Sequence, residues 1–128
     1  MIILLDTSTP ICKISFVSGQ ERQDVEWEAG RTLARNLLGF LHEKLLERGL
    51  GWSDITAVAV FKGPGSFTGL RIGLTVMNTL AHELKIPIVG ETGESWSLKA
   101  LERLQANQND QLVMPEYGAE AHITAPKK

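Results

Sequence analysis

A glycine-rich segment, residues 63–73, constrains the fold of this chain more than any other part of the sequence. It reads GPGSFTGLRIG, with four glycines in eleven residues. The preceding run, residues 56–61, is β-branched and apolar without strict alternation, which is typical of a central strand covered on both faces. Helical periodicity follows to about residue 84, and a short apolar run ends at Gly90. The order strand, helix, strand favours a parallel strand pair with the helix on one face of a mixed sheet.

The rest of the chain completes an α/β fold. Three short runs with turn residues between them, residues 2–5, 11–17 and 24–27, predict an antiparallel meander. Leucines at helical spacing predict a helix over residues 32–48, and a weaker, shorter helix is expected over residues 94–104. The expected architecture is a five-stranded mixed sheet of βββαβα order with helices packed on it. We expect one domain, residues 1–106, and a C-terminal tail, residues 107–128.

Charge and composition exclude several classes of function. The net charge is −2, and the sequence holds no cluster of Lys and Arg of the kind that binds nucleic acid, so any contact with RNA is expected to be indirect. No apolar stretch is long enough to cross a bilayer, and no basic leader opens the chain, so a cytoplasmic protein is expected. The single cysteine, Cys12, lies in an apolar run and is expected to be a buried thiol.

Two interpretations of the glycine-rich loop remain open. In the first, Gly63 and Gly65 form a tight turn and the hydroxyl of Ser66 or Thr68 caps the next helix. In the second, free N–H groups at the helix start bind a phosphate, with Asp6 at the end of the first strand contributing to the site. The P-loop and dinucleotide-binding patterns are both absent, because Leu70 follows Gly69 and position 68 is not Gly.

Metal-dependent hydrolysis has no support in the sequence. His42 and His82 are each followed by Glu, but residues 46 and 86 are Leu and Ile where a zinc-binding helix needs its second His. No metal ligand set and no catalytic residue are predicted.

Two glycines inside the second long helix indicate a close packing contact. Gly69 and Gly73 are four residues apart and therefore share one face of the helix. Each costs about 0.8–1 kcal/mol of helix stability relative to Ala, so the groove they leave is expected to be used. The occupant is either another element of this chain or a second chain.

Residues 63–73, together with the opening residues 3–8, resemble the TsaB (YeaZ) family over about residues 1–92. The resemblance implies an actin/Hsp70-like (ASKHA) N-terminal half. It also implies a non-catalytic subunit that binds and activates a TsaD-type protein in the synthesis of threonylcarbamoyladenosine (t6A) in tRNA. A TsaE-type ATPase would belong to the same complex, with ATP at the complex interface and no cofactor of the chain's own. The isolated chain is expected to form a homodimer.

The resemblance, with the glycine pair, gives a candidate partner interface on the two long helices. Its residues are Leu37, Phe40, Gly69, Leu70, Gly73, Val76 and Met77. The alternative is a small ATPase or phosphotransferase of the actin-like superfamily, with its phosphate site at Asp6, Gly63, Gly65 and Ser66. Family members typically carry a second actin-like half, and most of that half is expected to be missing from this chain.

Overall fold

The computed structural model describes residues 1–117, and residues 118–128, the last part of the expected tail, lie outside the described residues. One five-stranded mixed sheet has the order β3-β2-β1-β4-β5. β1 pairs antiparallel with β2 and parallel with β4, and β4 pairs parallel with β5. The strands are β1 (Ile2–Asp6), β2 (Ile11–Ser18), β3 (Glu21–Glu28), β4 (Ala57–Phe61) and β5 (Ile88–Glu91). The predicted α/β fold and its parallel strand pair are confirmed.

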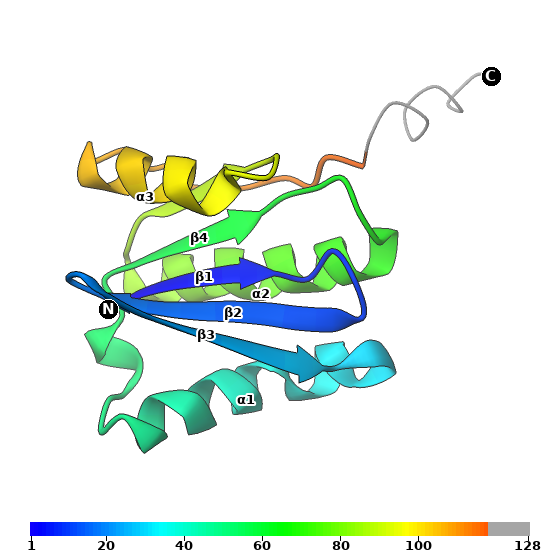
Figure 1. The fold of residues 1–128 in the computed structure, drawn as a ribbon, viewed down its shortest axis with the longest axis horizontal. Helices are drawn as coiled ribbons and strands as arrows, with labels where there is room; N and C mark the ends of the chain where they lie inside the picture. The colour runs from blue at the N-terminus through cyan, green and yellow to red at the C-terminus, as the bar shows by residue number, and fades with distance from the viewer. Residues whose placement is uncertain (118–128) are drawn as a thin grey trace.

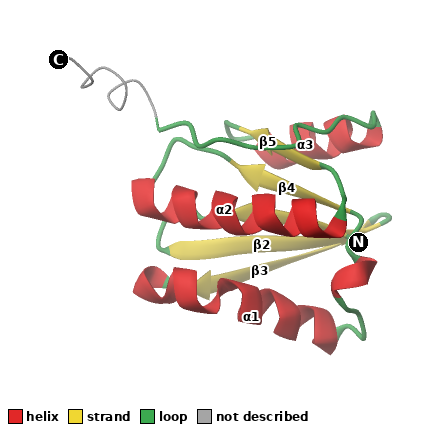
Figure 2. Ribbon diagram, turned by 180° about the vertical axis from the view of Figure 1, so that it is seen from behind, coloured by secondary structure: helices red, strands yellow, loops and turns green. Residues whose placement is uncertain are grey.

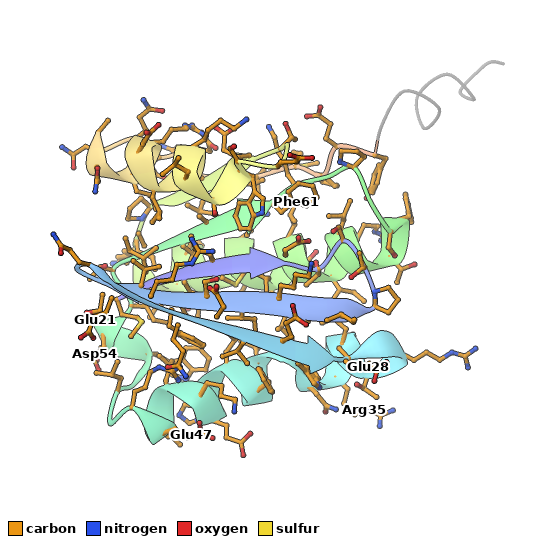
Figure 3. The ribbon with its side chains drawn as sticks, in the orientation of Figure 1. Glu21, Glu28, Arg35, Glu47, Asp54 and Phe61 are labelled. Atoms are coloured by element: carbon orange, nitrogen blue, oxygen red, sulfur yellow. The ribbon has the colours of Figure 1, made fainter. Side chains whose placement is uncertain are left out.

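Three α-helices cover the sheet on both faces: α1 (Leu33–Glu47), α2 (Phe67–Leu84) and α3 (Trp96–Gln105). Figure 2 shows α1 and α2 in front of the sheet and α3 behind it. The alternation of side chains explains this arrangement, because successive residues of a strand point to opposite faces. In β1, Ile3 and Leu5 belong to the core under α1 and α2, whereas Leu4 belongs to the core under α3. At the end of β4, Phe61 points toward α3, where its ring lies 5.9 Å from that of Trp96 (Figure 3).

The chain after α3 is part of the folded unit. We call residues 109–117 the strap; they form the orange trace that leaves α3 and passes beyond the end of β4 in Figure 1. Val113 is 4% exposed and belongs to the same core as α1 and α2. The expected domain boundary at residue 106 is therefore corrected, because the folded unit includes the strap.

The strap begins at the free edge of β5. The outward N–H groups of Ile88 and Gly90 donate to the side chains of Asn109 (3.1 Å) and Asp110 (3.0 Å). The Ile88 carbonyl accepts from the Asp110 N–H at 2.8 Å, and the Gly90 carbonyl accepts from the Arg103 guanidinium at 3.1 Å. All four outward groups of this edge are thus bonded, which closes it to a further strand.

No helix within residues 1–117 combines the length and the hydrophobicity needed to cross a bilayer.

Candidate partner-binding surface

The glycine-rich loop is a turn and a helix cap. Ser66 is the N-cap of α2, and its hydroxyl accepts a hydrogen bond from the Gly69 N–H at 3.2 Å. The Ser66 N–H donates to the Ser8 carbonyl at 2.8 Å, and the Ser8 side chain fills the space beside Gly65. The observed Ser66 cap agrees with the first interpretation of this loop, a tight turn followed by a helix cap.

Asp6 and Gly63 also contact residues of this chain. The Asp6 carboxylate accepts from the Ser8 N–H at 2.9 Å and so closes the turn after β1. Gly63 has a φ of +126°, which favours glycine, and the Glu116 carbonyl of the strap lies where a Cβ would be. The structure therefore brings Asp6, Gly65 and Ser66 together around Ser8, and Gly63 against the strap. The Ser66 N–H and the Gly69 N–H at the helix start already have acceptors.

The glycine pair of α2 is filled by the turn after β1. The Thr7 hydroxyl donates to the Gly69 carbonyl at 2.7 Å, and the Thr7 carbonyl lies in the space that a Cβ on Gly69 would need. The Thr7 side chain occupies the equivalent space beside Gly73. Thr7 is buried, so the groove is internal packing. The prediction that Gly69 and Gly73 contact a partner is corrected accordingly.

Three more of the predicted interface residues are core residues. Leu37, Leu70 and Met77 are fully buried and cannot contact a second chain in this structure. Leu37 and Met77 belong to the core between the helices and the sheet, and Leu70 lies beside Gly63. Their spacing on the helices indicates an apolar face, and burial within this chain accounts for it. Phe40 is partly buried and stacks on Trp27 of β3, with ring centroids 4.7 Å apart.

The exposed side of α2 lies next to this buried face on the helix surface. A groove of about 410 Å³ separates α2 from the first turn of α1. We call it the α1–α2 groove; six residues line it: Ala34, Thr68, Arg71, Ile72, Thr75 and Val76. Of the predicted interface residues, only Val76 lines it. Ile72 and Thr75 were missed, although they flank the buried stripe at the same three- and four-residue spacing that marks a helix's second face.

A second groove lies on the other side of the same helix. Its volume is about 520 Å³, and we call it the strap groove. Its lining residues are Arg71, Leu74, Thr75, Asn78, Thr79, Leu112, Val113, Met114, Pro115 and Tyr117. Arg71 and Thr75 line both grooves and form the ridge between them. Sequence analysis missed this groove because it expected the strap to be a tail.

The strap is held against α2 by a paired hydrogen bond. The Asn78 amide donates to the Val113 carbonyl at 2.8 Å and accepts from the Val113 N–H at 2.9 Å. Further along, the Glu116 N–H donates to the Lys62 carbonyl at 2.7 Å, and the Tyr117 ring lies 4.5 Å from that of Phe67. The strap is thus a fixed wall of the strap groove.

An ion-pair cluster fixes the other end of the strap. Arg103 of α3 bonds to Asp110, and its guanidinium lies 3.1 Å from the Glu91 carboxylate. Partial burial acts to raise the pKa of Asp110, but hydrogen bonds from Arg103 and the Gly90 N–H, with the nearby positive charges, lower it overall.

The remaining candidate groups are a possible metal cluster, the histidines and the single cysteine. No group of three His, Cys, Asp or Glu side chains within residues 1–117 could hold a metal ion. His42 stacks on Trp52, with ring centroids 5.3 Å apart. Burial, and then the charge of Asp6, raise the pKa of the Cys12 thiol to about 12, which removes the thiolate that a nucleophile needs.

Comparison with known sequences places these features in a protein family. A family model described as "TsaD: tRNA N6-adenosine threonylcarbamoyltransferase" matches residues 27–110. The tRNA threonylcarbamoyladenosine biosynthesis protein TsaB of Haemophilus influenzae is 34% identical over 88 residues, which cover 69% of this chain and 37% of that protein. The Bacillus subtilis TsaB is 38% identical over 81 residues, which cover 62% of this chain and 32% of that protein. The chain thus spans well under half the length of these curated relatives.

Two solved structures share the fold. YeaZ from Pseudomonas aeruginosa superposes with a TM-score of 0.67 at 28% identity, covering 83% of this chain and 49% of YeaZ. A crystal structure of an uncharacterized protein "with similarity to peptidase YEAZ" from the same organism gives a TM-score of 0.66 at 32% identity. That match covers 71% of this chain and 42% of the other. The actin-like N-terminal half is therefore confirmed.

Proposed function

Because the chain belongs, over its N-terminal part, to the TsaB (YeaZ) family, we propose that it is a non-catalytic subunit that binds and activates a TsaD-type protein in t6A synthesis. The chain also matches the family model described as TsaD. This match supports a partner whose fold is related to that of the chain itself. In this proposal the TsaD-type subunit performs the transfer, a TsaE-type ATPase joins the complex, and tRNA is contacted indirectly. The complex is cytoplasmic.

The observation that carries the proposal is the outer face of α2. Ile72 and Val76 are only partly buried, although both are apolar, and they line an open groove against α1. Arg71 is the single charged residue that lines this groove. Apolar lining with a charge at its edge is the usual composition of a protein interface. Without the TsaD-type partner, the same face pairs two copies of the chain.

The alternative, a small ATPase or phosphotransferase, is not favoured by any contact in the loop. Two of the N–H groups at this helix start, those of Ser66 and Gly69, are bonded to Ser8 and to the Ser66 hydroxyl. Asp6 closes its own turn. A phosphate bound at these two N–H groups would have to displace their partners.

The test is co-expression with the TsaD-type protein of the same organism, followed by size-exclusion chromatography. The two proteins are expected to co-elute. Thr75→Arg places a bulky charge on the exposed ridge without touching the core and is expected to abolish co-elution. Gln105→Arg places the same charge at an exposed position of α3, on the other face of the sheet, and should leave co-elution unchanged. Separate elution of the wild-type proteins at micromolar concentration would contradict the proposal.

A further inference from the structure

Two large apolar side chains of the strap are exposed on either side of a buried one. Leu112 is 61% exposed and Met114 is 65% exposed, whereas Val113 between them is 4% exposed. The strap is therefore extended here, with Val113 facing the core and its neighbours facing away from it. Large apolar side chains that gather on the wall of a groove mark contact surfaces more often than single exposed ones do.

The strap groove adjoins the α1–α2 groove across one ridge of α2. The two grooves share Arg71 and Thr75, so together they flank one ridge of α2. A ridge between two grooves is the shape that packs against a pair of ridges on another helical surface. Arg71 is the single charged residue among the residues that line either groove, and no ion pair within residues 1–117 holds it.

The two grooves together offer a partner more surface than either offers alone. Six residues line the α1–α2 groove, and the strap groove adds eight that the first does not contain. Because a standard interface uses roughly 20–30 residues on each side, a partner seated on the α2 ridge is expected to contact the strap side of the helix as well.

The strap is preorganised for this role. Asn78 fixes both backbone groups of Val113, and the bond between Arg103 and Asp110 fixes its start. A wall that is already ordered adds little ordering cost when a partner binds.

Resting on the proposed function, we propose that the strap is part of the partner-binding surface, and that Leu112 and Met114 contact the TsaD-type protein. The partner's matching surface presents two apolar ridges, with a carboxylate between them that faces Arg71. Asn78 is a positioning residue, because it contacts the strap and sets its place.

The experiment measures the affinity of the full chain for the TsaD-type protein by isothermal titration calorimetry. Leu112→Ser and Met114→Ser are each expected to weaken binding about tenfold, with the melting temperature nearly unchanged because both side chains are exposed. Leu98→Ser is the matched control, because Leu98 is 60% exposed on α3 and lies outside both grooves. It should bind like the wild type.

Asn78→Ala gives a second readout. It should weaken binding and also speed hydrogen exchange at the Val113 amide, which is bonded to the Asn78 side chain. Faster exchange with unchanged affinity would contradict the positioning role and the contact it supports.

The outcomes separate the two proposals. If the wild type binds and Thr75→Arg does not, while Leu112→Ser and Met114→Ser bind like Leu98→Ser, the strap contact is overturned and the proposed function stands. If the strap variants lose self-association with no change in partner affinity, the strap groove belongs to a second copy, which also overturns the strap proposal. If the wild type does not bind the TsaD-type protein, both proposals fail.

Discussion

The Thr7 side chain lies inside the space that a Cβ atom on Gly73 would occupy. Thr7 follows β1, and Gly73 lies in the second turn of α2, so this contact locks the helix against the end of the central strand. The Thr7 hydroxyl adds a bond to the Gly69 carbonyl at 2.7 Å. Together they explain why a helix tolerates two glycines at a cost in its own stability.

Gly73→Ala is expected to destabilise the fold by about 1–3 kcal/mol, because the added methyl group overlaps Thr7. Gly39→Ala is the matched control, since Gly39 lies in α1 with open space around its Cβ position. That variant should stabilise the fold by up to about 1 kcal/mol. Urea unfolding measures both changes.

A double-mutant cycle checks the cause of the Gly73 effect. Thr7→Ala removes the overlapping atoms, so the double variant should be more stable than the sum of the single changes predicts. If the two stability changes simply add, the cost of Gly73→Ala does not come from overlap with the Thr7 side chain.

Low pH should weaken the ion pair between Arg103 and Asp110 that fixes the start of the strap. The pKa of Asp110 is lower in the folded chain than its ordinary value of 3.8, so its carboxylate stabilises the fold above about pH 4. This contribution is lost as the pH falls through the lower, folded-state pKa. Asp110→Asn should therefore cost stability at pH 7 and progressively less below pH 4, as followed by thermal unfolding. A stability difference that does not change with pH would contradict the ion pair, and Glu102→Gln on the exposed side of α3 controls for the loss of one negative charge.

The thiol of Cys12 should be inert in the folded protein. Burial, with the charge of Asp6, raises its pKa to about 12, so almost no thiolate exists at pH 8. An aromatic disulfide reagent should react at the rate of unfolding in buffer, and at once in 6 M guanidinium. Rapid reaction in buffer would mean that the β1–β2 side of the core opens readily.

Ser66 should matter as a helix cap rather than as a ligand. Ser66→Ala removes the acceptor of the Gly69 N–H and is expected to cost about 1 kcal/mol. Ser95 is the N-cap of α3 but forms no such side-chain bond, so Ser95→Ala should cost much less. The purified chain should hydrolyse no ATP in either form. Turnover that disappears specifically with Ser66→Ala or Asp6→Ala would restore the enzymatic alternative.

The sequence predicted the sheet, because hydrophobic periodicity and turn residues are local signals. For the same reason it offered Ser66 or Thr68 as the helix cap, and the structure shows Ser66 in that position. It could not decide what fills the groove beside Gly69 and Gly73, since Thr7 lies about sixty residues away in the chain. Buried and partner-facing apolar residues also look alike on a helix, so Leu37, Leu70 and Met77 were assigned to the interface although all three are buried within this chain.

The strap was missed for a different reason. Its only buried side chain is Val113, and its hold depends on backbone bonds to Asn78 and Lys62 that leave no periodic pattern. Polar composition with a proline is typical of a loop, which is correct for its backbone but says nothing about where it docks.

The most direct test of the account measures t6A formation on tRNA by the TsaD-type protein, with the other pathway enzymes present and this chain added in increasing amounts. The account predicts that t6A forms only when this chain is present, saturates near stoichiometric addition, and is lost with Thr75→Arg but not with Gln105→Arg. Equal t6A formation with and without the chain would contradict its role as an activating subunit.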